Sequence, residues 1–298
     1  MLRTLALSFA MLAVIPGPCA AQSTAPAADF RNRVGINQPT PNSNSAAESS
    51  SGEDTAAENE LLEAANKSRE LAGVPPLRVG ESLREAARAH ARRMVESARL
   101  EHRLSGEPSL LERIALVSPL SGLKIDRAGE NIANATCAPG ANDALMRSAP
   151  HRENLLDRGF NVAGVAAIWS KGRLYVVQDF AHEVPSYSAQ QSGKLVGRSI
   201  DEMRQQAGLP ELRQLTPRNL DEAACKLAGE NRPNARLLAT AYDNRQIITY
   251  TQSRPEILPQ GALRMLRNPG VRQFAVGACY ARNAAYPTGI YWIAILLY

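Results

Sequence analysis

Histidine and acidic side chains in the first two thirds of the chain have types and spacing that could do chemistry. Three short strings contain them: Glu101-His102, Gly129-Glu130-Asn131-Ile132 and Pro150-His151-Arg152-Glu153-Asn154-Leu155-Leu156. Imidazole and carboxylate groups ligate divalent metals, and they also form hydrogen-bonded clusters without a metal. Each string by itself is weak evidence for a functional site, because such short strings occur by chance. The sequence contains no HExxH, no G-x-S-x-G and no Cys/His pair at a recognised spacing, so the common hydrolase motifs are absent.

Hydrophobic periodicity predicts the helices that position these side chains. A first helix begins at Glu58 and is ended by Gly73 and the Pro75-Pro76 pair. A second helix follows, with a capping-box pattern at Ser82 and Glu85. Its apolar face should point into a core and consists of Leu83, Ala86, Ala87, His90 and Met94.

The segment after the second histidine string predicts a helix and a hairpin. Residues 142–156 fit a short helix with a break at Pro150. Two apolar runs, Val162–Ile168 and Leu174–Phe180, flank Lys171-Gly172 and predict antiparallel strands. Helices mixed with antiparallel strands predict an α+β domain built in layers.

The order and separation of these strings are more specific than any one of them. Together with Asn66-x-x-Arg69 and the strand Val176-Val177-Gln178-Asp179-Phe180, they resemble the CAP superfamily in its short bacterial secreted form. This superfamily comprises cysteine-rich secretory proteins, antigen 5 and pathogenesis-related proteins. The resemblance covers about residues 59–181 and implies an α-β-α sandwich around a central antiparallel sheet.

The resemblance also implies a site. In the family, two histidines and two acidic residues line a cleft that binds a divalent metal, and His102, Glu130 and His151 match three of them. The second acid is missing, and Ser148 occupies its place. Two imidazoles and one carboxylate would suit Zn²⁺ and leave a position for water. Without metal, the three side chains would form a hydrogen-bonded cluster or serve separate structural roles, whereas His90 should be a buried structural residue.

Composition divides the chain into four segments. Residues 1–21 have the layout of a cleavable signal peptide, and the Ala-, Ser-, Pro- and Asn-rich residues 22–57 resemble a disordered linker. A CAP-like domain is expected over 58–185, and a degenerate second copy over 186–298. No stretch is long and apolar enough to span a bilayer, so we expect a secreted or periplasmic protein.

The second copy is predicted from matches in the same order as in the first domain. Arg69 to Leu77 resembles Arg204 to Leu212, and the apolar face that contains Leu83 is repeated from Leu220 onward. No histidine lies in this copy. Its two cysteines, Cys225 and Cys279, fall on elements that should pack together, which predicts a disulfide. Cys137 would then be the odd thiol of the mature chain.

These features favour a non-enzymatic protein that binds a lipid, a cell-wall component or another protein. The alternatives are a metal-dependent hydrolase acting on peptide or cell-wall material through His102, Glu130 and His151, and a purely structural envelope protein. The formal charge of +5 is dispersed over the sequence. A dispersed charge is typical of a solvated surface, so nucleic acid is not an expected partner.

Overall fold

The computed structural model describes residues 52–117, 123–216, 219–239, 241–242 and 246–298. The predicted signal peptide (1–21) and all but the end of the predicted linker (22–57) lie outside these ranges. The chain divides into two compact units. The first comprises residues up to Gly106, Gly129–Arg158 and Ala163–Phe180, and the second comprises Glu107–Ala128, Gly159–Val162 and Ala181–Tyr298.

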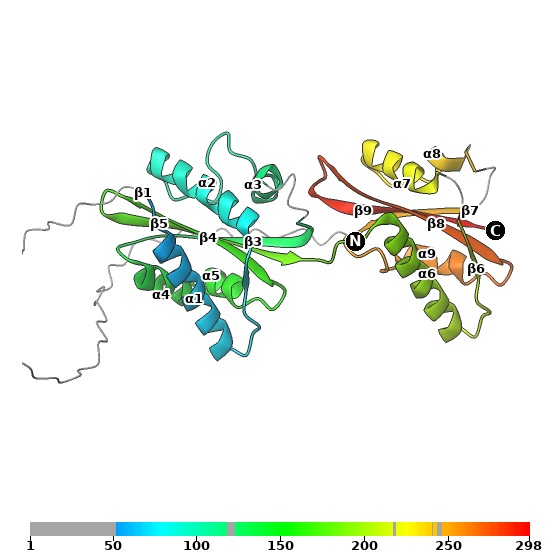
Figure 1. Cartoon of the computed structure of the whole chain (residues 1–298), viewed down its shortest axis with the longest axis horizontal. Coiled ribbons are helices and arrows are strands. Elements are labelled where there is room, and N and C mark those ends of the chain that lie inside the picture. Colours follow the sequence, from blue (N-terminus) through cyan, green and yellow to red (C-terminus); the bar gives the residue numbers. More distant parts are fainter. Residues whose placement is uncertain (1–51, 118–122, 217–218, 240, 243–245) are drawn as a thin grey trace, which may run out of the picture. The chain divides into compact units, whose positions relative to one another are not determined.

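The first sheet lies between two helical layers (Figure 1). Its strand order is β1-β4-β5-β3, and β2 also pairs with β4. Helices α1, α4 and α5 cover one face, and α2 covers the other. The α+β sandwich expected from the resemblance is therefore confirmed. The strands are β1 (Gly52–Glu53), β2 (Arg78–Val79), β3 (Ile125–Ala135), β4 (Val162–Ser170) and β5 (Arg173–Glu183); the helices are α1 (Thr55–Leu71), α2 (Glu81–Ser97), α3 (Leu110–Val117), α4 (Ala138–Arg147) and α5 (Ala149–Leu155).

The second sheet has the strand order β6-β8-β9-β7. Helices α6 and α9 lie on one face and α7 and α8 on the other (Figure 1). Strand β6 pairs with β8 in parallel, whereas β8 and β7 each pair with β9 in antiparallel. The elements are α6 (Ala189–Gln206), β6 (Arg213–Leu215), α7 (Leu220–Gly229), α8 (Arg236–Ala239), β7 (Gln246–Gln252), α9 (Gln260–Leu266), β8 (Gln273–Asn283) and β9 (Tyr286–Leu297).

Helix starts differ from two of the sequence predictions. Helix α1 begins at Thr55, inside the range predicted as linker, because the Asp54 side chain accepts a hydrogen bond from the backbone of Ala57. Helix α2 begins at Glu81 with Gly80 as its N-cap and no side-chain cap. The predicted capping box at Ser82 is therefore wrong. The backbone N–H of Gly80 donates to the carbonyl of Ala163, and the helix starts two residues earlier than the Ser82 cap predicts.

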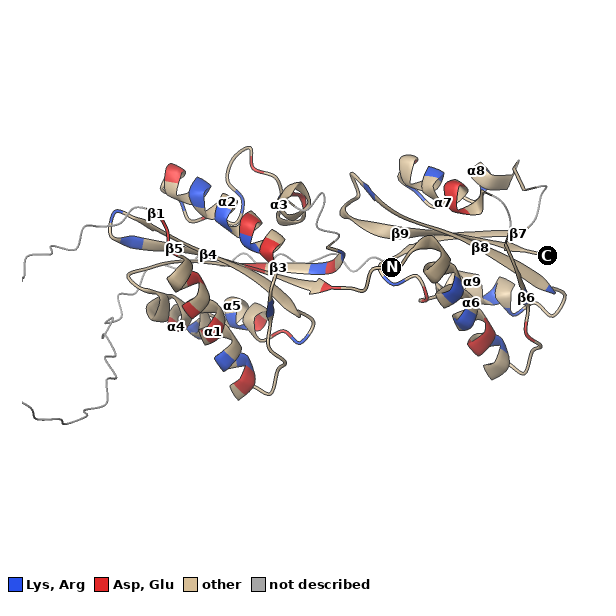
Figure 2. Cartoon of the chain, viewed as in Figure 1, with Lys and Arg blue, Asp and Glu red and all other residues tan. Residues whose placement is uncertain are grey.

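Most of the other local predictions are confirmed. The predicted apolar face of α2 is buried, including His90. Strands β4 and β5 are adjacent in the sheet, as the hairpin prediction required. The helical stretch near Pro150 is interrupted at Ser148, which ends α4 and precedes α5. Figure 2 shows both signs of charge interspersed along the helices, in keeping with the dispersed charge of the sequence.

In each unit, a fully buried arginine lies on a long helix, Arg69 on α1 and Arg204 on α6. Arg69 donates from Nε to the carbonyl of Pro75 at 2.8 Å and from Nη1 to that of Leu155 at 2.9 Å. In the second unit, Arg204 donates from Nε to Pro210 at 2.8 Å and from Nη1 to Leu266 at 2.6 Å. Burial lowers the pKa of both guanidinium groups. Both side chains join a helix end to the loop after it and to a distant helix.

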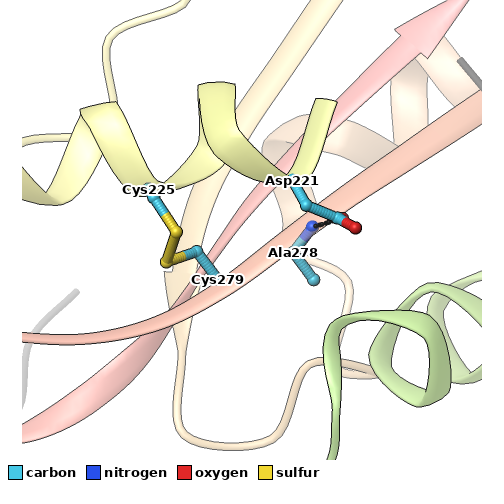
Figure 3. The surroundings of a disulfide bond; sticks show 4 residues. All are labelled: Asp221, Cys225, Ala278 and Cys279. Atoms are coloured by element: carbon cyan, nitrogen blue, oxygen red, sulfur yellow. Dashed lines mark hydrogen bonds between the residues drawn. A yellow bond between two sulfur atoms is a disulfide. The ribbon is translucent and has the colours of Figure 1, made fainter. Parts of the chain in front are cut away.

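A disulfide joins Cys225 on α7 to Cys279 on β8 (Figure 3), as predicted. The Cα atoms are 5.1 Å apart, which is normal for such a bond. On the same helix, Asp221 accepts a hydrogen bond from the backbone of Ala278 at 2.9 Å. Cys137 is also disulfide-bonded in the full-length chain. The prediction of an odd thiol concerns the mature chain, after removal of residues 1–21, and it stays a prediction.

Candidate functional site

The first unit brings together the three residues that the family resemblance selected. His102 follows α2, Glu130 lies in the middle of β3, and His151 lies on α5. His102 Nδ1 is 2.8 Å from Glu130 Oε1. The imidazoles of His102 and His151 are stacked, with ring centroids 6.4 Å apart and planes inclined by 28°. Three elements distant in sequence therefore meet at one point.

Ser148 holds the second imidazole. Its hydroxyl lies 2.8 Å from His151 Nδ1, and both side chains are buried. The pKa of His151 is lowered, first by burial and then by the proximity of His102. The ring is therefore neutral near pH 7. A serine at the position of the expected acid thus orients the imidazole without adding a charge.

His90 belongs to the same group of side chains, although helical periodicity predicted only its burial. The side chain is fully buried, and Nε2 lies 3.9 Å from Glu130 Oε2. Periodicity identifies which face of α2 is covered but not which strand residue lies opposite, so this proximity had no signal in the sequence. We call His90, His102, Glu130, Ser148 and His151 the histidine cluster.

A network of amides joins the strand of the cluster to its helix. Asn131, fully buried beside Glu130, donates from Nδ2 to the carbonyl of His151 at 3.0 Å and to Gln178 Oε1 at 3.3 Å. Asn154 on α5 donates to the carbonyl of Glu130 at 3.2 Å and to Asn131 Oδ1 at 3.1 Å. These bonds fix α5 against β3. They also fix the separation between Glu130 and His151.

The contacts within the cluster determine how it fits a metal ion. Glu130 and Ser148 each engage an imidazole through Nδ1, which is the usual role of a residue that orients a ligand. In the described part of the chain, no group of three or more His, Cys, Asp and Glu residues is arranged to hold a metal. The metal set His102, Glu130 and His151 stays a prediction, and no chemistry is derived from it.

Comparison with known proteins identifies the class of the first unit. Residues 62–180 match the model of the cysteine-rich secretory protein family, CAP. The uncharacterized protein YkwD of Bacillus subtilis is 30% identical over 117 residues, which cover 39% of this chain and 44% of that protein. The chain thus spans less than half the length of this curated relative. Over residues 62–180 the chain therefore resembles the CAP superfamily in its bacterial form, and the resemblance predicted from the sequence motifs is confirmed.

Two solved structures are also similar to the chain. One is an extracellular protein containing an SCP domain from Bacillus anthracis, with 22% identity, a TM-score of 0.39 and coverage of 43% of this chain and 41% of that one. The other is an outer surface protein from Borrelia burgdorferi, with 16% identity, a TM-score of 0.41 and coverage of 45% of this chain and all of that one. Among the described helices, none is both long and apolar enough to cross a membrane.

Proposed function

We propose that this protein is exported and binds a cell-wall peptide or glycan, without turnover, at the histidine cluster of its CAP domain. The observation that carries the proposal is the pair of stacked imidazoles, each held through Nδ1 by a protein oxygen. Within the described residues, His151 Nε2 has no hydrogen-bond partner. A buried polar atom of this kind calls for an explanation, and a ligand hydroxyl, amide or carboxylate would supply the missing bond.

Exposure and polarity favour a small polar group as the part of the ligand that is recognised. The side chains of His102 and Glu130 are 11% and 5% exposed, so the cluster touches solvent over a narrow area. Imidazole and carboxylate groups pair with hydroxyl and amide groups better than with an acyl chain. A lipid or a protein ligand is the alternative within the binding class.

Export is supported by two observations. The Cys225–Cys279 disulfide indicates an oxidising compartment, where such bonds persist. The names of the two similar solved proteins place them outside the cell or at its outer surface. We infer that residues 1–21 are a signal peptide and that the mature protein is secreted or periplasmic.

The second unit is proposed to be a degenerate copy of the CAP fold over about residues 186–298, following a first domain over about 58–185. In the first sheet, four strands lie in the order β2-β4-β5-β3. The second sheet has the order β6-β8-β9-β7, in which the strands occupy the same positions relative to their order along the chain. Arg69 and Arg204 make corresponding hydrogen bonds. A Cβ added at Gly164 or Gly277 would lie within 2.6 Å of Leu83 or Leu220, the corresponding leucines at the start of α2 and α7. Chance does not readily produce all three similarities.

The binding proposal is tested by sedimentation of purified peptidoglycan with wild-type protein and with His102→Gln/His151→Gln. The matched control is His182→Gln, because His182 is 38% exposed and pairs with Asp126 away from the cluster. We expect the double variant to lose at least about tenfold in affinity, as one or two lost hydrogen bonds to a ligand predict, while the control binds normally. Equal binding by all three proteins would contradict the proposal.

The same mixture distinguishes binding from hydrolysis. Mass spectrometry of the supernatant should find no soluble fragments released by the wild-type protein. Release of fragments that disappears with His151→Ala would establish the metal-dependent hydrolase instead. Binding to phospholipid vesicles, but not to peptidoglycan, would move the ligand to the lipid class.

A further inference from the structure

The second unit buries one lysine among tyrosine rings, apart from the histidine cluster. Lys124 precedes β3 and is 8% exposed. Its Nζ lies 3.9 Å from the ring centroid of Tyr280 on β8 and 4.7 Å from that of Tyr291 on β9. Nζ also donates to Tyr291 Oη at 3.0 Å. All three residues belong to the second compact unit.

The charge of this lysine is placed against aromatic faces. Burial lowers the pKa of Lys124, since removal from water disfavours the ammonium form. The negative face of an aromatic ring attracts a cation, and the attraction grows when the cation is desolvated. Two such faces and a phenolic oxygen therefore replace part of the lost hydration.

The tyrosine rings are held by backbone groups as well as by the lysine. Tyr291 Oη accepts a hydrogen bond from the backbone N–H of Tyr187 at 2.7 Å. Tyr280 donates from Oη to the carbonyl of Thr288 at 2.8 Å. The rings of Tyr280 and Tyr291 meet edge to face, with centroids 5.0 Å apart. Their orientation is thus supported by contacts that do not involve Lys124.

Glycine at position 289 leaves room for the ring of Tyr280. A Cβ at Gly289 would lie 2.5 Å from a carbon of the Tyr280 ring, closer than such atoms approach. The φ angle of 93° is also one that residues with a side chain rarely adopt. Gly289 therefore allows the Tyr280 ring to lie across β9, where it faces the lysine.

We propose that Tyr280 and Tyr291 form a binding site for an alkylammonium group, and that Lys124 is its internal occupant. The site anchors the chain segment before β3 to the second sheet. If the lysine side chain is removed, a free alkylammonium ion of matching size takes its place. This inference is independent of the ligand proposed for the histidine cluster.

The test is chemical rescue of Lys124→Ala in the full-length protein. The probe is n-propylammonium, which corresponds to the part of the lysine side chain that the substitution removes. We expect Lys124→Ala to lower the thermal midpoint by several degrees, and n-propylammonium to restore it in a saturable manner. Neutral n-propanol should not restore it. Absence of rescue, or equal rescue by n-propanol, would overturn the proposal.

Two further variants keep the result interpretable. Lys171→Ala is the matched control, since Lys171 is an exposed lysine in the turn between β4 and β5, and neither its midpoint nor its response to n-propylammonium should change. If Lys124→Ala does not fold, Lys124→Met preserves the aliphatic stem and removes only the charge. A thermal midpoint of Lys124→Met equal to that of the wild type would then refute the proposed alkylammonium site. Rescue of Lys124→Ala that persists in the Tyr280→Leu background would refute it as well.

Discussion

Four strands of the first sheet lie in the same order as the four strands of the second, but the two units differ in what they bury at the positions that the proposed duplication pairs. Under the proposed duplication, the counterpart of His90 on α2 is Leu227 on α7, and both are fully buried. The proposed counterpart of His151, four residues before Leu155, is Ala262, four residues before Leu266, because Arg69 and Arg204 bond to the carbonyls of those two leucines. One unit buries polar side chains where the other buries apolar ones. Since buried polar groups are costly unless paired, this difference is what the proposed function expects if the histidines serve a site rather than the fold.

The second unit has features of its own. A disulfide joins α7 to β8, and two tyrosines surround Lys124. These features join elements together, whereas those of the first unit create a polar cluster. The proposed function places ligand binding in the first unit and a supporting role in the second. The following predictions test this assignment, beginning with the largest effect.

The buried arginines should be equally important in both units. Arg69→Met and Arg204→Met each remove hydrogen bonds to buried carbonyls, and each should destabilise its own unit by about 3 kcal/mol or more. The two tryptophans report separately, because Trp169 lies in the first unit and Trp292 in the second. Urea unfolding in Trp169→Phe and Trp292→Phe backgrounds measures each transition. A large loss in only one unit would break the proposed correspondence.

The disulfide should stabilise the second unit alone. Cys225→Ala/Cys279→Ala opens a bond between residues separated by 54 positions. We expect the second unit to lose about 2–4 kcal/mol, in the range typical of a native disulfide. The Trp292 signal should shift to lower urea, while the Trp169 signal stays constant. An equal shift of both signals would argue against a local role.

Replacing a cluster histidine by its counterpart should separate stability from binding. His151→Ala introduces the residue found at the corresponding position of the second unit. The unfolding free energy of the first unit should fall by about 2 kcal/mol or more, because a buried side chain and its hydrogen bond to Ser148 are lost. The affinity for peptidoglycan in the sedimentation assay should also fall, by at most the factor expected for the His102→Gln/His151→Gln variant. A large loss of stability with normal binding would show that the histidine serves the fold.

The stability of the first unit should fall with acidification. Because the pKa of His151 is lowered in the folded state, the unfolded chain binds the proton more tightly. Stability is therefore highest above the unfolded value of about 6.5 and decreases as the pH falls through that value toward the folded one. Urea midpoints followed between about pH 7.5 and pH 5 should decrease less in His151→Ala than in wild type. Identical slopes would mean that His151 does not titrate differently on folding.

Local patterns in the sequence predicted much of this fold, and long-range contacts explain what they missed. Periodicity identified the covered face of α2 and the β4–β5 hairpin. It did not predict that His90 lies near Glu130 or that Lys124 lies against Tyr280, because those contacts join elements distant along the chain. The Ser82 capping box failed because a backbone bond at Gly80 determined the helix start.

The candidate site was predictable only in part. His102, Glu130 and His151 came from the family motifs, whereas the buried amides Asn131 and Gln178 link different elements and have no local signal. At position 148 the family pattern predicts an acidic residue, and this chain has a serine there. The structure shows its positive role, a hydrogen bond to His151 Nδ1 at 2.8 Å.

The most direct test of the account is an NMR titration of isotope-labelled full-length protein with a soluble peptidoglycan fragment. The account predicts saturable shifts of the imidazole signals of His102 and His151 and of backbone signals near Glu130. Signals of the second unit, including those near Cys225, should remain unchanged. Saturable shifts confined to the second unit, with the histidine signals unaffected, would contradict the central claim that the histidine cluster is the binding site.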